Sequence, residues 1–252
     1  ERYSMKEVHF IAQGKGGVGK SFIASLIAQY LKQQGEAQIH CFDTDPVNPT
    51  FSRYKALNVE VVKILTANNN IDSRNFDGLI EKLIELDGVG VIDNGAATFV
   101  PLMSYLAENG VPELLGESGV RMVVHVPVQG GQALEDCLMG LVQTSQSLNA
   151  EVVVWLNDYN GAVVHDGKSF QDMKAYKVSA SKIIGTINIV GRNPDTFGKD
   201  IQNMTSLNLT FDEVMDSTEF TLMPRQRLKT FKRDIFEQLD KQTIFAKGDA
   251  NE

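Results

Sequence analysis

A glycine-rich segment near the N-terminus constrains the fold of this chain more than any other feature. Residues 14–21 read GKGGVGKS, which fits the phosphate-loop pattern G-x-x-x-x-G-K-[ST] and adds a second lysine, Lys15, after the first glycine. Glycines in this pattern let backbone N–H groups curl around a polyphosphate. Lys20 would reach the outer phosphates, and the Ser21 hydroxyl can ligate Mg²⁺. The segment therefore predicts a strand, a phosphate-binding loop and a helix in succession.

The sequence on either side of the loop supports this prediction. Residues 8–13 are mostly apolar and predict a buried strand, and residues 21–34 have the spacing of an amphipathic helix. The loop then lies at a helix N-terminus, where free N–H groups and the helix dipole favour anions. The alternative is a glycine-rich turn that contains lysines by coincidence. By composition alone, such a match is expected in about one chain in a hundred of this length.

The rest of the chain alternates short apolar runs with helical stretches, which is typical of a parallel sheet. The predicted fold class is α/β, a mostly parallel twisted sheet with helices on both faces, forming one P-loop domain over residues 1–252. The predicted strands cover residues 8–13, 38–42, 89–92, 121–126, 152–156 and 182–187, with a further edge strand at 59–65. The predicted helices cover residues 21–34, 74–86, 99–108, 131–147 and 224–239.

Composition narrows the class of protein. The formal net charge of −8 argues against a protein whose whole surface binds nucleic acid, and no apolar run approaches the ~18 residues of a membrane span. Cys41 and Cys137 lack the spacing of a metal site, so we expect both in the core. A reducing, cytoplasmic location fits best, with a peripheral position at the membrane or nucleoid as an alternative. Met5 is a candidate native start, and we expect residues 1–4 to be extraneous or flexible and residues 243–252 to be a flexible tail.

Three predicted strands end in polar residues suited to a nucleotide site, because ligands of parallel sheets bind beyond the carboxyl ends of the strands. Asp45 lies in a DTDP sequence, whose proline fixes an extended exit from the strand. Asp93 ends an apolar strand, where an aspartate typically holds Mg²⁺ through water. Asn157 ends another and could pair with a base edge. Taken singly, Asp45 could instead cap a turn and Asn157 could satisfy local backbone groups.

These motifs together resemble a known family. The KGGVGKS sequence at 15–21 resembles the deviant Walker A motif of the ParA/MinD family of ATPases, DTDP at 43–46 resembles its first switch, and Asp93 its Walker B aspartate. The chain from Val8 to Leu239 also resembles the TraL proteins of conjugative plasmids. The similar blocks are residues 13–15, 43–48, 73–77, 91–96, 130–134, 165–170 and 225–229. The resemblance implies the P-loop NTPase fold of MinD-like proteins.

The resemblance also implies a role for each motif residue, with ATP and Mg²⁺ as cofactors. Lys15 would reach across an ATP-dependent homodimer to the partner's nucleotide, and Lys20 would bind the phosphates. Asp45 would orient the attacking water. Asp93 would sense the γ-phosphate and, with Ser21, hold Mg²⁺.

The base site is implied in the same way. Asn157 matches the position that reads adenine, and the loop from Ile189 to Arg192 matches the second wall on the base, although the usual proline of that loop is missing. The complete nucleotide-binding set implied by the resemblance is Gly14, Lys15, Gly16, Gly17, Val18, Gly19, Lys20, Ser21, Phe22, Asn157 and Ile189.

The expected function is a molecular switch in plasmid conjugation, mobilisation or positioning, with a conjugation or partition protein as partner. We expect slow, partner-stimulated ATP hydrolysis because no arginine in the motif blocks is an obvious finger. One alternative is an adaptor that senses the nucleotide with little hydrolysis. Another is an amidotransferase- or synthetase-like enzyme on the same fold, for which no additional catalytic groups are evident. The two cysteines do not match the paired cysteines of metal-cluster carriers, and the C-terminus lacks the tyrosine-rich tail of bacterial tyrosine kinases.

Two further segments carry weaker predictions. Residues 223–233 are basic and open a helix with an apolar stripe that continues to Leu239; packing of the stripe on the sheet is favoured, with contact to DNA or a membrane surface as alternatives. His125 lies in an apolar strand and is expected in the core. The block from His165 to Phe170 carries no predicted chemical role.

Overall fold

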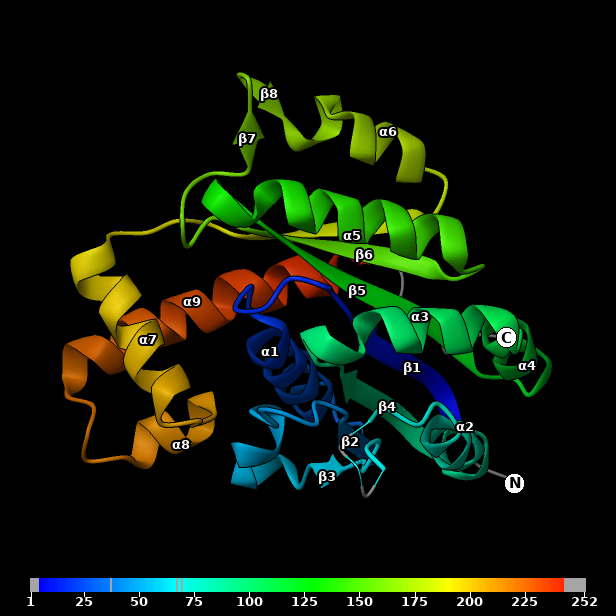
Figure 1. Cartoon of the computed structure of the whole chain (residues 1–252). Helices are drawn as coiled ribbons and strands as arrows, with labels where there is room; N and C mark the ends of the chain where they lie inside the picture. The colour runs from blue at the N-terminus through cyan, green and yellow to red at the C-terminus, as the bar shows by residue number, and fades with distance from the viewer. Residues whose placement is uncertain (1–4, 37, 67, 69, 243–252) are drawn as a thin grey trace, which may run out of the picture.

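Seven parallel strands form the central sheet (Figure 1). The structure is a computed structural model that describes residues 5–36, 38–66, 68 and 70–242; the expectations for residues 1–4 and 243–252 lie outside this range. The strand order is β3-β2-β4-β1-β5-β6-β9. In that order the strands cover Glu60–Val61, Ile39–Asp43, Gly88–Asp93, Met5–Ile11, Arg121–Gln129, Glu151–Asn157 and Ile183–Ile189. The predicted fold class is confirmed.

Each of the six main predicted strands is present, with ends shifted by up to three residues. The edge strand predicted at 59–65 is wrong in length, because β3 pairs with β2 only over Glu60–Val61. Its partner β2 ends at Asp43, and the last contact between the two segments is the Val62 N–H donating to the Asp43 carbonyl at 2.8 Å. After Val62 the segment no longer pairs with β2, and Leu65 instead forms an isolated antiparallel bridge with Ile71.

The five predicted helices are also present, as α1 (Lys20–Gln33), α2 (Asn75–Glu85), α3 (Phe99–Glu108), α5 (Leu134–Ser147) and α9 (Leu222–Asp240). The helix predicted from residue 131 begins at Leu134, because Gly131 has a φ of +74°, outside the helical region. Sequence reasoning missed the short helices α4 (Val111–Glu117), α6 (Lys174–Ser179), α7 (Lys199–Ser206) and α8 (Phe211–Asp216), and the β7–β8 hairpin (Val164–His165 and Lys168–Ser169).

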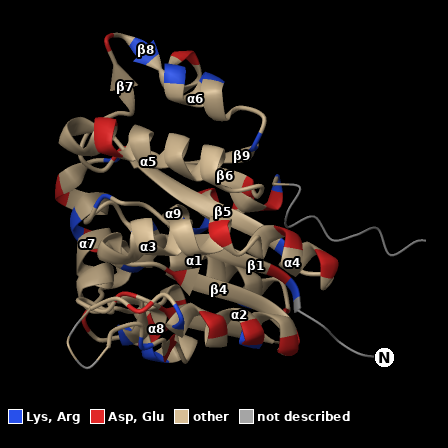
Figure 2. Ribbon diagram, turned by 45° about the vertical axis from the view of Figure 1, so that its right-hand side comes forward, with Lys and Arg blue, Asp and Glu red and all other residues tan. Residues whose placement is uncertain are grey.

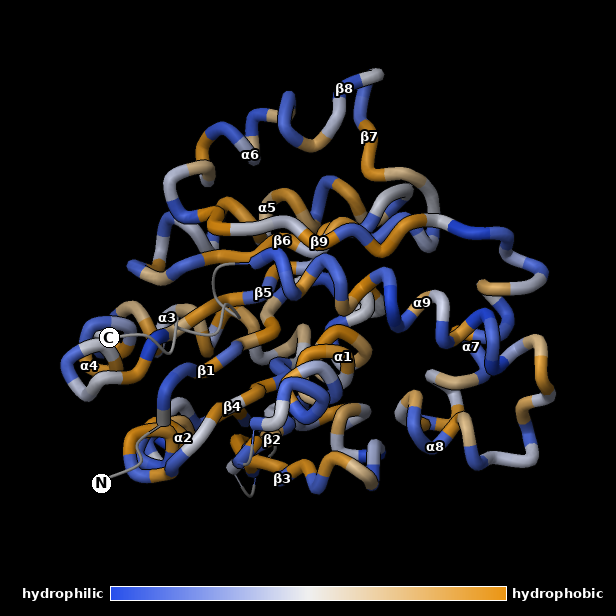
Figure 3. The backbone as a smooth tube through the Cα atoms, turned by 180° about the vertical axis from the view of Figure 1, so that it is seen from behind, coloured by the Kyte–Doolittle hydropathy of each residue, from blue (hydrophilic) through white to orange (hydrophobic). Residues whose placement is uncertain are grey.

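The helices cover both faces of the sheet (Figures 1 and 3). Helices α2 to α5 bury their apolar side chains on one face, with α6 packed outside α5, and α1, α7, α8 and α9 cover the other. Along β1, Phe10 belongs to the first cluster and Ile11 to the second, and both are fully buried. A strand buried on both faces is apolar at most positions, which explains the near-continuous apolar runs.

Helix α9 is part of this core. The apolar stripe of Leu228, Phe231, Ile235 and Leu239 is buried, and the Phe231 ring stacks on Phe22 of α1 with centroids 6.0 Å apart. The prediction that this helix packs on the sheet is confirmed, so the stripe is not available for insertion into lipid. Over the residues the structure places, no helix combines the length and apolar character needed to cross a membrane.

A buried aromatic cluster lies on the α1 face of β1, β5 and β6. The Trp155 indole N–H donates to His125 Nδ1 at 2.9 Å, so His125 Nε2 carries the proton and donates to His9 Nδ1 at 2.9 Å. Burial lowers the pKa of His125 well below its usual value. Cys41 and Cys137 are buried as well. The predictions that His125 and both cysteines are core residues are confirmed.

Candidate nucleotide site

The glycine-rich loop joins β1 to α1 at the carboxyl edge of the sheet. Gly17 and Gly19 have φ values of +72° and +96°, a backbone conformation that costs other residues strain. Gly19 is the N-cap of α1, and Lys20 opens the helix. The first amides of α1 therefore have no partner within the helix and are available to an anion.

A buried glutamine fixes the start of the loop. Gln13 Nε2 donates to the Pro127 carbonyl at 2.9 Å and to the Cys137 carbonyl at 3.0 Å, while Gln13 Oε1 accepts from the Gly14 N–H at 2.9 Å. A Cβ atom on Gly140 of α5 would lie 1.9 Å from Gln13 Oε1. The loop is thus tied to β5 and α5 by one side chain that only a glycine at position 140 accommodates. No spacing rule in the sequence joins residues so far apart.

Ser21 and Asp93 form the inner end of the site. Ser21 Oγ donates to Asp93 Oδ2 at 2.5 Å, and Asp93 Oδ1 is buried with no hydrogen-bond partner in the described part of the chain. Burial raises the pKa of Asp93 to about 7, although the Ser21 hydrogen bond opposes the shift. A carboxylate with a spare oxygen beside a hydroxyl is a fitting ligand set for Mg²⁺, and the ion's charge would favour the ionised form.

Mg²⁺ needs few ligands from the protein. Among the residues with described positions, no three His, Cys, Asp or Glu side chains come together to hold a metal ion. Mg²⁺ in nucleotide sites takes only one or two protein ligands and completes its shell with water and phosphate oxygens. Ser21 and Asp93 would hold the ion, as the sequence predicts.

The two lysines of the loop have different environments. Lys20 is buried, and its Nζ donates to the Lys15 carbonyl at 2.8 Å. Burial lowers the pKa of Lys20, while the charges of Asp93 and Asp45 oppose the shift. Lys15 is half exposed, and its Nζ lies 2.7 Å from Asp136 Oδ2 of α5, a contact that raises the pKa of Lys15. Lys20 therefore points into the loop, and Lys15 lies along its outer side.

The segment after β2 folds into a capped turn. Buried Asp43 accepts from the Asp45 N–H and the Ser52 N–H at 3.0 and 2.9 Å. Asp45 Oδ1 accepts from two amides of its own turn, at 2.9 and 3.0 Å. Asp45 Oδ2 faces Gly95, where an added Cβ would lie 2.7 Å away. The alternative role of Asp45, as a cap of the turn, accounts for Oδ1. Its Oδ2 lies beside the segment that follows Asp93.

A pocket of about 280 Å³ adjoins the loop and brings together five residues of the predicted set: Gly17, Gly19, Phe22, Asn157 and Ile189. Asn157 Nδ2 donates to the Val18 carbonyl at 3.3 Å, and Asn157 Oδ1 accepts from the Tyr159 N–H at 3.1 Å. The amide thus braces the loop while facing the pocket. Its reading of adenine stays a prediction, as do the binding roles of the other predicted residues.

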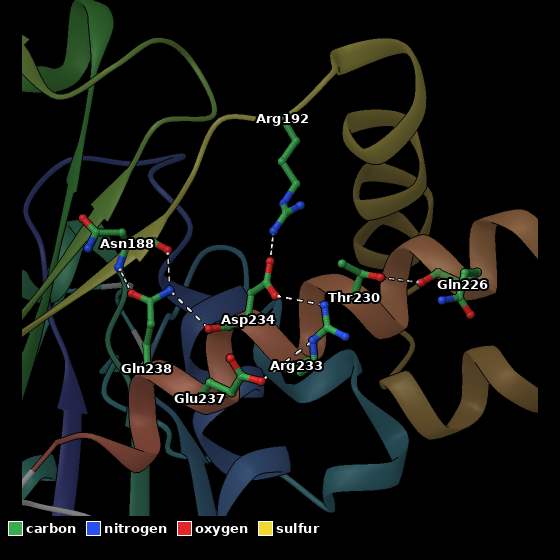
Figure 4. A network of polar contacts seen from close by, with 8 residues as sticks. All are labelled: Asn188, Arg192, Gln226, Thr230, Arg233, Asp234, Glu237 and Gln238. Atoms are coloured by element: carbon green, nitrogen blue, oxygen red, sulfur yellow. Dashed lines mark hydrogen bonds and ion pairs between the residues drawn. The ribbon is translucent and has the colours of Figure 1, made fainter.

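The sequence predicted only part of the second wall of the pocket. Residues 189–192 line it. Pro194 lines it as well, two positions after the loop that lacks the family's usual proline. Arg192 lies 4.8 Å from the Phe197 ring centroid and is ion-paired with Asp234 of α9 (Figure 4). In the same figure Gln238 of α9 bonds both backbone groups of Asn188, at 2.7 and 2.9 Å. The wall is therefore fastened to the last helix.

Comparison with known proteins agrees with a nucleotide site. A family model described as the CobQ/CobB/MinD/ParA nucleotide binding domain matches residues 9–223. The chain is 48% identical over 238 residues to an Escherichia coli protein TraL, covering 94% of this chain and 98% of that protein. A second Escherichia coli TraL is 45% identical over 242 residues, with coverages of 95% and 100%. The chain belongs to the MinD/ParA family and to its TraL members.

Comparison with solved structures gives matches at lower sequence identity. The MinD cell division protein of Aquifex aeolicus is 16% identical, with a TM-score of 0.48, covering 90% of this TraL-type chain and 95% of that protein. A putative plasmid partition protein of Borrelia burgdorferi bound to AMPPNP is also 16% identical, with a TM-score of 0.48 and coverages of 93% and 98%.

Proposed function

We propose that this protein is an ATP-hydrolysing switch that dimerises in the presence of ATP and acts in plasmid conjugation, mobilisation or positioning. One observation carries the proposal. Ser21 Oγ donates to Oδ2 of the buried Asp93 at 2.5 Å, next to a glycine loop with two left-handed residues. Asp93 Oδ1 has no hydrogen-bond partner among the described residues. A phosphate loop followed by a carboxylate that a cation would stabilise is the arrangement that phosphoryl transfer uses. The conjugation role rests on the similarity to the TraL proteins.

The chemistry follows from the residues around the loop. Lys20 would exchange the Lys15 carbonyl for a phosphate oxygen, and the amides of α1 would hold the remaining charge. Mg²⁺ bound by Ser21 and Asp93 would neutralise further negative charge on the phosphates. Asp45 Oδ2 lies on the same rim as Asp93 and would accept a hydrogen bond from the attacking water. Positioning and charge neutralisation account for most of the catalysis of this reaction.

Dimerisation would act through Lys15. Its ion pair with Asp136 is exposed, with 41% and 49% of the two side chains accessible, so breaking it costs little. A phosphate of a second subunit would offer the same ammonium group more negative charge in a drier environment, where the attraction is stronger. Exchange of Asp136 for a nucleotide across the interface would therefore link ATP binding to assembly.

Calorimetry and gel filtration test the proposal together. Titration of MgATP into the full chain is expected to release heat, and Asp45→Ala, in which turnover should be blocked, is expected to elute as a dimer with MgATP. Lys15→Gln in the Asp45→Ala background should bind MgATP with similar affinity yet elute as a monomer. Lys32→Gln, on the exposed end of α1, is the matched control and should dimerise. Folded protein that binds no MgATP would contradict the whole proposal, and a persistent monomer would contradict its dimer.

A second candidate function is an adaptor that senses ATP without hydrolysing it. The capped turn favours it, because Asp45 Oδ1 already accepts two hydrogen bonds and is not free for water. Phosphate release distinguishes the two functions. Turnover that Asp45→Ala abolishes supports the hydrolase, whereas MgATP binding with no phosphate release, alone or with DNA or anionic vesicles, supports the adaptor.

A further inference from the structure

A groove separates α5 from α6, well away from the phosphate loop's pocket. Its volume is about 600 Å³, and its lining includes Leu138, Met139 and Val142 of α5 and Lys174, Ala175 and Val178 of α6. We call this feature the α5–α6 groove. None of its lining residues lines the nucleotide pocket, so its role does not depend on the proposed function.

The groove follows the two helices. Its apolar residues share one face of each helix: 138 and 139 lie four and three positions before 142, and 175 lies three before 178. Met139 is 67% exposed and Val178 is 43% exposed, so both apolar side chains are accessible to a partner. An apolar groove bordered by polar residues is typical of a surface that binds another protein.

The charge along the α6 side of the groove is positive. Residues 137–149, which include most of α5, contain no charged side chain, and residues 173–182 contain Lys174, Lys177 and Lys182 but no carboxylate. Figure 2 shows the lysines of α6 above an α5 that is charged only at its start. The whole chain has a net charge of −8, so this basic border runs against the average.

Acidic residues lie at the starts of the two helices, and Glu135 is on the same face of α5 as Leu138, Met139 and Val142. Asp136, at the start of α5, pairs with Lys15, and Asp172, directly before α6, accepts from the Ser169 hydroxyl at 2.6 Å. Lys182 donates to Asn149 at the far end of the groove. Lys174 and Lys177 therefore supply the positive charge of the α6 side.

We propose that the α5–α6 groove binds an amphipathic helix of a partner protein, with an apolar stripe that enters the groove and acidic residues on either side of the stripe. A helix matches the groove because its side chains at i, i+3, i+4 and i+7 fit between those of two packed helices. Met139 supplies a flexible side chain that adapts to the stripe. Lys174 and Lys177 pair with the flanking carboxylates, which select this helix over a basic one.

Three labelled synthetic helices test the proposal by fluorescence anisotropy with the full chain. One carries a leucine stripe with glutamates on both sides, the second the same stripe with lysines, and the third the glutamates with serines in place of the leucines. The first is expected to bind at least tenfold more tightly than the other two. Met139→Glu should weaken its binding at least tenfold, whereas Leu114→Glu, a half-exposed apolar residue of α4 outside the groove, should leave it unchanged.

Charge reversal completes the test. Lys174→Glu combined with Lys177→Glu should weaken binding of the acidic helix and strengthen binding of the basic one. Equal affinity for both helices, or an affinity that Met139→Glu does not change, would overturn the proposal. Binding of a DNA oligonucleotide through the same lysines, or a groove-dependent dimer of the chain without peptide, would overturn it in favour of those occupants. MgATP titration of Met139→Glu should match that of the unmodified chain, which separates this test from that of the ATPase.

Discussion

The two ends of the nucleotide site are built differently. The phosphate end consists of backbone amides, glycines with left-handed backbones and the buried Asp93, at the carboxyl edge of the sheet. The base end consists of side chains on loops after β6 and β9, fastened to α9 by the half-exposed Arg192–Asp234 pair. Buried groups with no solvent alternative tolerate little change, whereas exposed ion pairs contribute little. The phosphate end should therefore dominate both affinity and stability.

Removing the buried ammonium is expected to have the largest effect. Lys20→Ala should weaken MgATP binding at least 100-fold, about 3 kcal/mol, because a charge-assisted contact to phosphate is lost from a buried position. Isothermal titration calorimetry measures the change, and circular dichroism checks that the variant is folded. An affinity within a few fold of the unmodified chain would show that the phosphate end does not dominate.

The packing of Gln13 against Gly140 gives the next effect, on stability. Gly140→Ala should lower the free energy of unfolding by about 2–3 kcal/mol, because the added methyl displaces a side chain that makes two buried hydrogen bonds and one partly buried hydrogen bond. Urea denaturation measures it. Gly116→Ala is the control, since its Cβ meets nothing within 4 Å on exposed α4. Gly140→Ala in a Gln13→Ala background should cost much less, and additive effects would refute the coupling.

The buried carboxylate of Asp93 should make stability depend on pH. Its pKa rises from near ~4 in the unfolded chain to about 7 in the fold. Between about pH 4 and pH 7 the folded state therefore binds more protons than the unfolded state. The free energy of unfolding falls as pH rises through this range. Asp93→Asn should accordingly be more stable than the unmodified chain by about 1–3 kcal/mol at pH 8 without Mg²⁺ or nucleotide, and equal to it near pH 4. Denaturation at both pH values tests this, and a constant difference would refute it.

The base end should give the smallest effect. Asp234→Asn should weaken MgATP binding only about 3- to 10-fold, because it loosens Arg192 without removing a phosphate contact. Inorganic tripolyphosphate with Mg²⁺ has no base, so its affinity should not change. Loss of both affinities to the same extent would mean that α9 supports the whole site and that the two ends are not independent.

The sequence predicted these two ends with unequal success, for a physical reason. The phosphate loop, Ser21 and Asp93 follow local rules, since glycines adopt left-handed backbones and parallel strands end at one edge of a sheet. Gln13 with Gly140, and Arg192 with Asp234, are pairs separated by more than 40 residues that meet only after folding. The missed helices have six to eight residues, too few turns for a periodic pattern to be recognised.

Helix α9 has a consequence for the order in which a newly made chain becomes competent. The phosphate loop is synthesised well before α9, yet Phe22 rests on Phe231 and the base wall is fixed through Asp234. A growing chain on the ribosome thus carries its loop for some 200 residues before the support for the adenine side exists. Tight nucleotide binding would then require a chain synthesised through α9. Fragments released earlier would retain the phosphate-loop motif but bind the nucleotide weakly.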